Sequence, residues 1–229
     1  MKVISVLGRK GGSGKTLVSH YLSLGLGRMG YDVIMLQTDV RTARPQEYIK
    51  DRPYWLVSIH GDPSTDLNLM RDVYARANRI PNSVLIVDGG ANRRNVDLFV
   101  AGTSHLVLIP VGVSAEDIAV ATADYDEIAS HLEANNGIAE VYFILNRWPG
   151  EMRKQDVLLK RKWVSDFLNQ DESRRFPISI PDMPSLMDIT FDMPPYPVSP
   201  QMTKRAIDAA EIIAMKLGLK EPTILAAAE

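Results

Sequence analysis

The sequence predicts a single α/β domain built on a doubly wound, mostly parallel sheet with helices on both faces. Three observations lead to this prediction. Short apolar runs alternate along the chain with longer segments of helical periodicity, which is typical of parallel strands joined by crossover helices. The 229 residues are 45% hydrophobic and 24% charged, which is enough for one sizeable core. A glycine-rich segment directly follows the first apolar run, at the end of a strand where such sheets bind ligands.

Seven apolar runs are predicted as strands of this sheet. Their aliphatic and β-branched residues suit strands that are buried on both faces. The five core strands are expected at residues 3–7, 33–36, 84–87, 105–109 and 142–145, and two shorter ones at 55–59 and 177–180.

Five segments are predicted as helices, at residues 15–29, 64–78, 114–134, 153–169 and 201–217. Gly30 ends the first helix, and Ser114 caps the third, where Glu116 and Asp117 suit the positive end of the helix dipole. One domain is therefore expected over residues 1–217, followed by a short tail over 218–229.

Composition narrows the possible functions. Cysteine is absent, which excludes disulfides and thiolate catalysis and fits a cytoplasmic location. The net charge of −2 argues against a globally basic nucleic-acid binder, so any contact with DNA must come from a local patch. No apolar run suggests a membrane span, and the first residues do not resemble a signal peptide.

The glycine-rich segment is the most informative motif. Residues 8–16 read Gly-Arg-Lys-Gly-Gly-Ser-Gly-Lys-Thr and lie between the first strand and the first helix. Free backbone N–H groups and the helix dipole favour a phosphate group there. Lys15 adds a positive charge, and Thr16 can offer its hydroxyl to Mg²⁺. The expected phosphate-binding residues are Lys10, Gly11, Gly12, Ser13, Gly14, Lys15 and Thr16.

Two features of this loop depart from the common phosphate-loop pattern. Arg9 stands where a glycine is usual, and Lys10 is an additional lysine before the glycine pair. With these features the loop resembles the deviant Walker A ATPases of the ParA/MinD superfamily, most closely small plasmid ParA-type proteins. The resemblance extends from residue 1 to about 215. It implies a P-loop NTPase fold, ATP and Mg²⁺ as cofactors, and a homodimer in which Lys10 reaches the partner's ATP.

Two aspartates near predicted strand ends match further motifs of that family. Asp88 ends the run 84–87 as a Walker B aspartate does, and it is expected to orient the Mg²⁺ shell. Asp39 matches the family's aspartate that orients the attacking water near Mg²⁺, and with Thr16 and Asp88 it is a candidate residue of the metal site. Gln37 and Arg41 depart from the family pattern, which leaves the Mg²⁺ geometry and the hydrolysis rate open. The alternative interpretations are a turn aspartate for Asp88 and a solvated loop aspartate for Asp39.

The adenine-binding residues implied by the resemblance lie later in the chain. Asn146 follows the predicted strand 142–145, and Pro181 and Asp182 belong to an Ile-Pro-x-Asp-like loop. An amide can pair with an adenine edge, and a proline loop can pack against the ring.

A basic segment is a candidate for contact with DNA. Residues 153–162 contain five basic residues and a single acidic residue, Asp156. The basic residues are Arg153, Lys154, Lys160, Arg161 and Lys162. They indicate either a phosphate-contacting patch for non-specific DNA or the solvated face of a helix. Arg174 and Arg175 are further candidates for this patch, and Arg93 and Arg94 are candidates either for the patch or for the dimer interface.

The resemblance implies an ATP-dependent dimerising switch ATPase for plasmid or chromosome partition. Its ATP-bound dimer holds non-specific DNA, and a centromere-binding partner protein stimulates its weak hydrolysis, which places it on the nucleoid. The alternative is a ParA-like positioning ATPase for another cargo, such as conjugation or cell-envelope machinery. A metabolic P-loop ligase is a third possibility. A membrane-bound form is not expected, because the tail 218–229 has one lysine against two glutamates.

Overall fold

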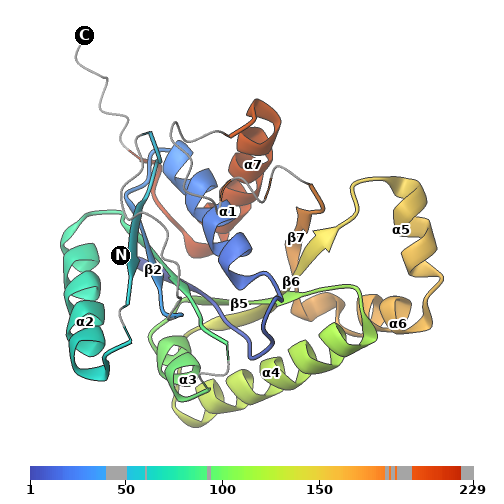
Figure 1. Ribbon diagram of the computed structural model, residues 1–229, viewed down its shortest axis with the longest axis horizontal. Helices are drawn as coiled ribbons and strands as arrows, with labels where there is room; N and C mark the ends of the chain where they lie inside the picture. Colours follow the sequence, from blue (N-terminus) through green and yellow to red (C-terminus); the bar gives the residue numbers. More distant parts are fainter. Residues whose placement is uncertain are drawn as a thin grey trace.

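A seven-stranded sheet forms the centre of the computed structural model (Figure 1). The structure describes residues 1–39, 51–59, 61–91, 94–183, 186, 189 and 198–222. The described strands are β1 (Lys2–Val6), β2 (Val33–Gln37), β3 (Trp55–Ser58), β4 (Val84–Asp88), β5 (Leu106–Val111), β6 (Glu140–Trp148) and β7 (Arg175–Pro181). Their order is β3-β2-β4-β1-β5-β6-β7, and all neighbours are parallel. This arrangement confirms the predicted fold class.

Helices cover both faces of the sheet (Figure 1). α1 (Lys15–Arg28) and α7 (Pro200–Leu217) pack together on one face. The other face is covered by α2 (Pro63–Arg79), α3 (Arg94–Gly102), α4 (Ala115–Ala134) and α6 (Lys162–Gln170). α5 (Met152–Leu159) lies beyond the β6–β7 edge, and η1 (Glu172–Arg174) leads into β7. None of the described helices is long and apolar enough to cross a membrane.

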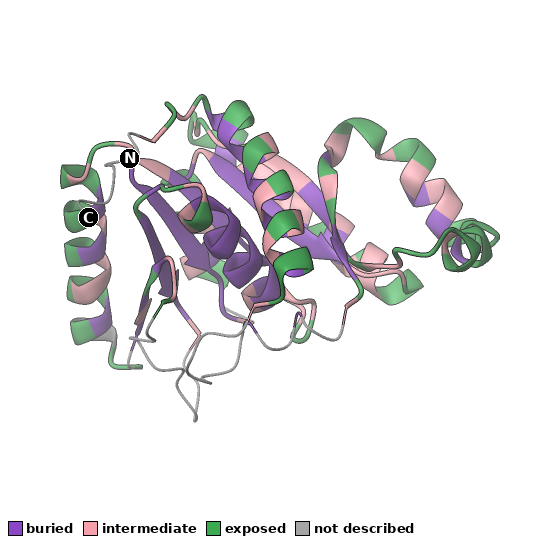
Figure 2. Cartoon of the chain, turned by 90° about the horizontal axis from the view of Figure 1, so that it is seen from above, coloured by how far each residue is buried: buried purple, intermediate pink, exposed green. Residues whose placement is uncertain are grey.

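The core divides into two apolar layers because successive side chains of a strand point to opposite faces. In β1, Ile4 and Val6 face α1 and α7, whereas Val3 packs into the layer beneath α2, α3 and α4. Figure 2 shows the sheet buried and the outer faces of the helices exposed. Burial of each such aliphatic side chain stabilises the fold by roughly 1.5–3 kcal/mol. The sheet is therefore a rigid base for the loops at its carboxyl edge.

The prediction of a single helix over 153–169 is wrong, because this segment forms two helices. Arg161 has an extended backbone (φ −80, ψ 117) and separates α5 from α6. Leu158 and Phe167 are both buried, yet they lie nine residues apart. At about 100° per residue, a continuous helix would place them on opposite sides. The break allows both side chains to be buried.

Other differences concern strand ends and one short helix. The sequence pattern does not predict α3. β6 extends to Trp148, so Asn146 lies inside a strand and not after it. Predictions that involve Arg41, Arg93 and most of the tail 218–229 concern positions outside the described residues.

Candidate nucleotide-binding site

A cavity of about 240 Å³ lies at the carboxyl edge of the sheet. The loop between β1 and α1 forms one wall, and the segments after β2 and β4 form another. The lining residues are Gly11, Gly12, Gly14, Lys15, Thr16, Leu17, Asp39, Gly89, Ala91 and Arg147. The structure thus brings together most of the predicted phosphate-binding residues with Asp39, as the strand-end argument predicts.

The backbone of the loop depends on its glycines. Gly12 and Gly14 have left-handed backbones, with φ of 77° and 94°. A Cβ atom at Gly14 would lie 1.9 Å from the side-chain nitrogen of Asn146. That nitrogen, Nδ2, donates a hydrogen bond to the backbone oxygen of Ser13 over 2.7 Å. The loop is therefore held against β6 at a point where no side chain fits.

Lys15 is a buried cation that faces the loop. Its side chain is 7% exposed, and Nζ donates to the backbone oxygen of Lys10 over 3.0 Å. Burial lowers the pKa of Lys15, which Asp88, Asp97 and Asp39 oppose in that order, with a smaller effect from Asp124. A desolvated ammonium group enclosed by backbone dipoles is suited to a phosphate group.

Asp88 links helix α1 to the segment that follows β2. It is fully buried, and its Oδ1 accepts a hydrogen bond from Ser19 Oγ of α1 over 3.3 Å. Its backbone oxygen accepts from both N and Oγ1 of Thr38, each over 2.9 Å. The same Oγ1 accepts from the backbone N–H of Gly90 over 3.2 Å. The end of β2, and with it Asp39, is thus tied to the segment after Asp88.

The side chain of Gln37 makes a structural contact between two strands. It is 2% exposed, and its Oε1 accepts from Ser58 Oγ of β3 over 3.0 Å. Gln37 pairs in register with Asp88 across β2 and β4. Gln37 therefore joins β2 to its neighbouring strand β3.

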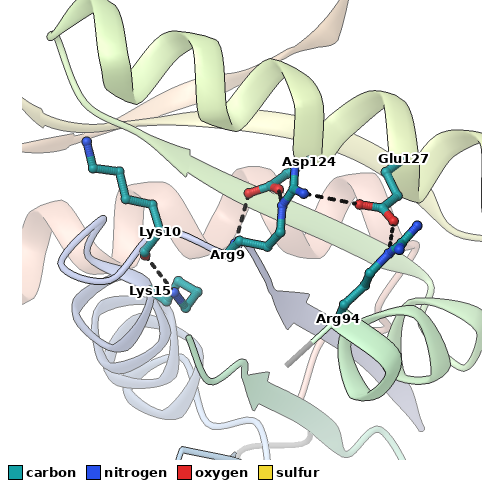
Figure 3. A network of polar contacts seen from close by, with 6 residues as sticks. All are labelled: Arg9, Lys10, Lys15, Arg94, Asp124 and Glu127. Carbon is teal, nitrogen blue, oxygen red and sulfur yellow. Dashed lines mark hydrogen bonds and ion pairs between the residues drawn. The ribbon is translucent and has the colours of Figure 1, made fainter. Parts of the chain in front are cut away.

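The side chain of Lys10 points away from Lys15 and toward the start of α4 (Figure 3). Its Nζ lies 3.0 Å from Oε1 of Glu116 and 2.8 Å from Oδ1 of Asp117. Burial acts to raise the pKa of Asp117, but hydrogen bonds from Lys10 and Ser114 outweigh it, and the net direction is downward. Lys10 is held at the rim by carboxylates, so its amine faces outward from its own cavity.

A second ionic network, which the sequence pattern does not predict, begins at Arg9 (Figure 3). The backbone N–H of Arg9 donates to Oδ2 of Asp124 over 2.9 Å, and its guanidinium pairs with Oδ1 of the same carboxylate. Glu127 lies 3.7 Å from Arg9 and also pairs with Arg94 at the start of α3. The side chain that replaces the usual glycine thus connects the loop to two helices.

The predicted adenine-binding residues are distributed around neighbouring hollows. Asn146 is buried at 3% exposure beside the loop. Pro181, the last residue of β7, borders a hollow of about 320 Å³ next to α1 and α7. Asp182 borders another of about 550 Å³ that Arg147 separates from the phosphate cavity. The adenine role of these three residues stays a prediction.

All five predicted DNA-contacting residues are exposed on α5, on α6 or between them. Lys154 forms an ion pair with Glu151, the residue before α5, and Lys162 forms one with Asp166 within α6. By contrast, Arg174 and Arg175 make contacts inside the domain: Arg174 pairs with Asp126 and Asp171, and Arg175 donates to the backbone oxygen of Leu168. The five exposed basic residues on and between α5 and α6 stay the main candidates for contact with DNA.

No protein-family model matches this sequence, and no curated protein matches it. Three solved structures illustrate its similarity to known folds. MinD in the MinC:MinD cell division protein complex of Aquifex aeolicus has 18% identity and a TM-score of 0.64, with 94% of this chain and 96% of that chain covered. McdA of Cyanothece, solved in complex with ATP, has 14% identity and a TM-score of 0.67, with 96% and 97% covered.

The third structure is cobyrinic acid a,c-diamide synthase from Mycobacterium smegmatis with a bound ATP analogue and magnesium. It has 14% identity and a TM-score of 0.64, with 98% of this chain and 99% of that chain covered. The described domain therefore has the fold of these MinD, McdA and synthase structures, which confirms the expected resemblance at the level of the fold. The same fold also serves a synthase, so function has to be argued from the site.

Proposed function

We propose that this chain is an ATP-dependent, dimerising switch ATPase of the ParA/MinD type. The observation that carries the proposal is the opposite direction of two lysines in one loop. Lys15 is buried and faces the cavity, whereas Lys10 points outward from the rim. In this proposal, Lys15 binds the chain's own nucleotide and Lys10 binds that of a partner. McdA and MinD are solved in nucleotide complexes or with a protein partner, which agrees with such a cycle.

The residues around the cavity fit a magnesium nucleotide. The left-handed glycines leave the loop backbone open to phosphate oxygens, and Lys15 supplies a desolvated positive charge. Thr16 and Asp88 would hold Mg²⁺, directly or through water, and the ion would neutralise charge on the phosphates. Asp39, which lines the same cavity, would orient the attacking water. Hydrolysis is proposed to be weak until a partner protein stimulates it.

Variants of the two lysines test the proposal, with ATP-dependent dimerisation as the measurement. In light scattering after size exclusion, the unmodified chain should dimerise with ATP and Mg²⁺ but not with ADP. Lys15→Ala should lose nucleotide binding, and dimerisation with it. Lys10→Ala should keep ATP binding within about threefold and lose most of the dimer. Full dimerisation of Lys10→Ala would refute the role given to this lysine.

The ATP-bound dimer is further proposed to hold non-specific DNA for plasmid or chromosome partition. The patch on α5 and α6 is exposed, and a dimer doubles the number of its charges. Gel shifts on random duplex DNA should show binding with ATP that weakens as salt increases. Removing two charges per chain (Lys160→Gln and Arg161→Gln) should reduce the salt slope by up to about 4. Arg71→Gln with Arg79→Gln on α2 is the matched control, because these exposed cations lie at the other edge of the sheet.

Positioning of a protein cargo is the second candidate function, and exposed apolar side chains favour it. Met152 is 79% exposed and Val157 is 54% exposed on α5, and Trp163 is 43% exposed on α6. Contacts to DNA phosphates do not require such side chains, whereas protein interfaces do. If the ATP-bound dimer does not bind random DNA even at low salt, the cargo interpretation is favoured over partition.

A further inference from the structure

Arg147 has an unusual backbone for its residue type. Four described non-glycine residues have positive φ: Asp51, Asn82, Asn136 and Arg147. Asparagine and aspartate tolerate the left-handed conformation, but arginine gains nothing from it locally. At φ 55, Arg147 lies inside β6 and not in a turn. A strained residue in a strand requires an explanation in the surrounding structure.

Contacts of the residues on both sides of Arg147 hold its backbone in this conformation. Asn146, one residue earlier, is buried and bonded to the backbone oxygen of Ser13. Trp148, one residue later, accepts a hydrogen bond at its backbone oxygen from the N–H of Asp182 over 3.0 Å. The register between β6 and β7 shifts between Leu145 and Trp148. Arg147 therefore occupies a bulge, a device that redirects one side chain at the edge of a site.

The bulge places Arg147 between two hollows. It lines the 240 Å³ cavity of the phosphate-binding loop, and it also lines the 550 Å³ hollow beside α5. Val113, Pro149 and Leu158 give the larger hollow an apolar part, and Asp182 adds a carboxylate. Within the part of the chain that the structure describes, no carboxylate forms an ion pair with Arg147. An exposed guanidinium group thus lies where the two spaces meet.

We propose that Arg147 is a nucleotide-positioning residue that binds the junction between the phosphates and the ribose. This inference rests on the proposed function. It places the phosphates in the smaller cavity and the nucleoside in the hollow beside α5. A guanidinium group suits the junction because its N–H groups pair with phosphate oxygens while its flat face packs on a ring. The strain at Arg147 is then the consequence of directing this group at the ligand.

Calorimetric titration of the full chain with ATP and with ADP tests the inference. Arg147→Gly removes the guanidinium group and relieves the left-handed backbone, so the variant should melt at the same or a higher temperature. Its dissociation constants for ATP and ADP should nevertheless increase about 10- to 100-fold. Arg147→Met, which keeps the strain, should show the same loss of affinity, and Arg147→Lys should recover part of it.

Asn136→Gly is the matched control, because Asn136 has φ 52 and lies between α4 and β6. It should leave both dissociation constants unchanged. If Arg147→Gly and Arg147→Met bind ATP within about threefold of the unmodified chain, the inference is refuted while the proposed function stands. If the unmodified chain itself does not bind ATP, the proposed function fails, and the inference fails with it.

Discussion

Replacing Gly14 by alanine tests how the phosphate-binding loop is held. Gly14 precedes the first turn of α1 and has φ 94, ψ 18. A Cβ atom there would lie 1.9 Å from Asn146 Nδ2, which belongs to the hydrogen bond that fastens the loop to β6. Alanine therefore imposes a left-handed backbone and also displaces the amide.

The magnitude follows from these two effects. A left-handed conformation costs an L-residue about 1–2 kcal/mol. Loss of the Asn146–Ser13 hydrogen bond costs about 1 kcal/mol more. Gly14→Ala should thus lower the free energy of unfolding by about 2–3 kcal/mol. For a domain of this length, each kcal/mol shifts the melting temperature by roughly 2–4 °C, which gives a decrease of about 4–12 °C.

Two neighbouring glycines provide graded controls in thermal melts without nucleotide. Gly12 has φ 77, and a Cβ atom there would meet nothing within 4 Å, so Gly12→Ala should show only the backbone strain of about 1–2 kcal/mol. Gly11 has open space and no left-handed φ, so Gly11→Ala should melt close to the unmodified chain. If Gly14→Ala melts within about 2 °C of Gly12→Ala, which is less than the shift expected from one hydrogen bond, the bracing role of Asn146 is refuted.

Three further predictions concern charge and packing. Lys15 has a lowered pKa through burial, and bound phosphate should raise it again. Nucleotide binding at a pH of about 9–10 should therefore take up protons, measured by calorimetry in two buffers, and this uptake should decrease as the pH is lowered; an uptake that does not change with pH would contradict the assignment to Lys15. Glu116→Gln combined with Asp117→Asn should release Lys10 and strengthen ATP-dependent dimerisation in sedimentation experiments; weaker dimers would contradict this. Gly25→Ala should destabilise the domain in urea, because its Cβ would lie 2.0 Å from a backbone oxygen of α7.

The strands could be predicted because their signal is local. A strand buried on both faces reads as a continuous apolar run, and Val84–Asp88 and Val33–Gln37 are such runs. The break at Arg161 could not be predicted in this way. It follows from the burial of both Leu158 and Phe167, which depends on tertiary structure.

The residues of the site also differ in whether their signal in the sequence is local. Residues of the loop could be predicted because their spacing within one short segment defines their chemistry. Arg9 and Asp124 are 115 positions apart, and Ser13 and Asn146 are 133 positions apart. Only the order of strands in the sheet brings these pairs together. For the same reason, Arg147 carries no signal in the sequence beyond its place next to Asn146.

The contacts of Lys10 explain why its two proposed roles can be separated by mutation. Its backbone oxygen accepts the hydrogen bond from Lys15 Nζ, whereas its side chain reaches Glu116 and Asp117. A phosphate group that binds Lys15 competes with that oxygen, and a partner's phosphate competes with those carboxylates. Both competitions act on one residue, so nucleotide binding and dimerisation are expected to be linked through it. Lys10→Ala keeps the oxygen and removes the amine, and should therefore break the second step while leaving the first intact.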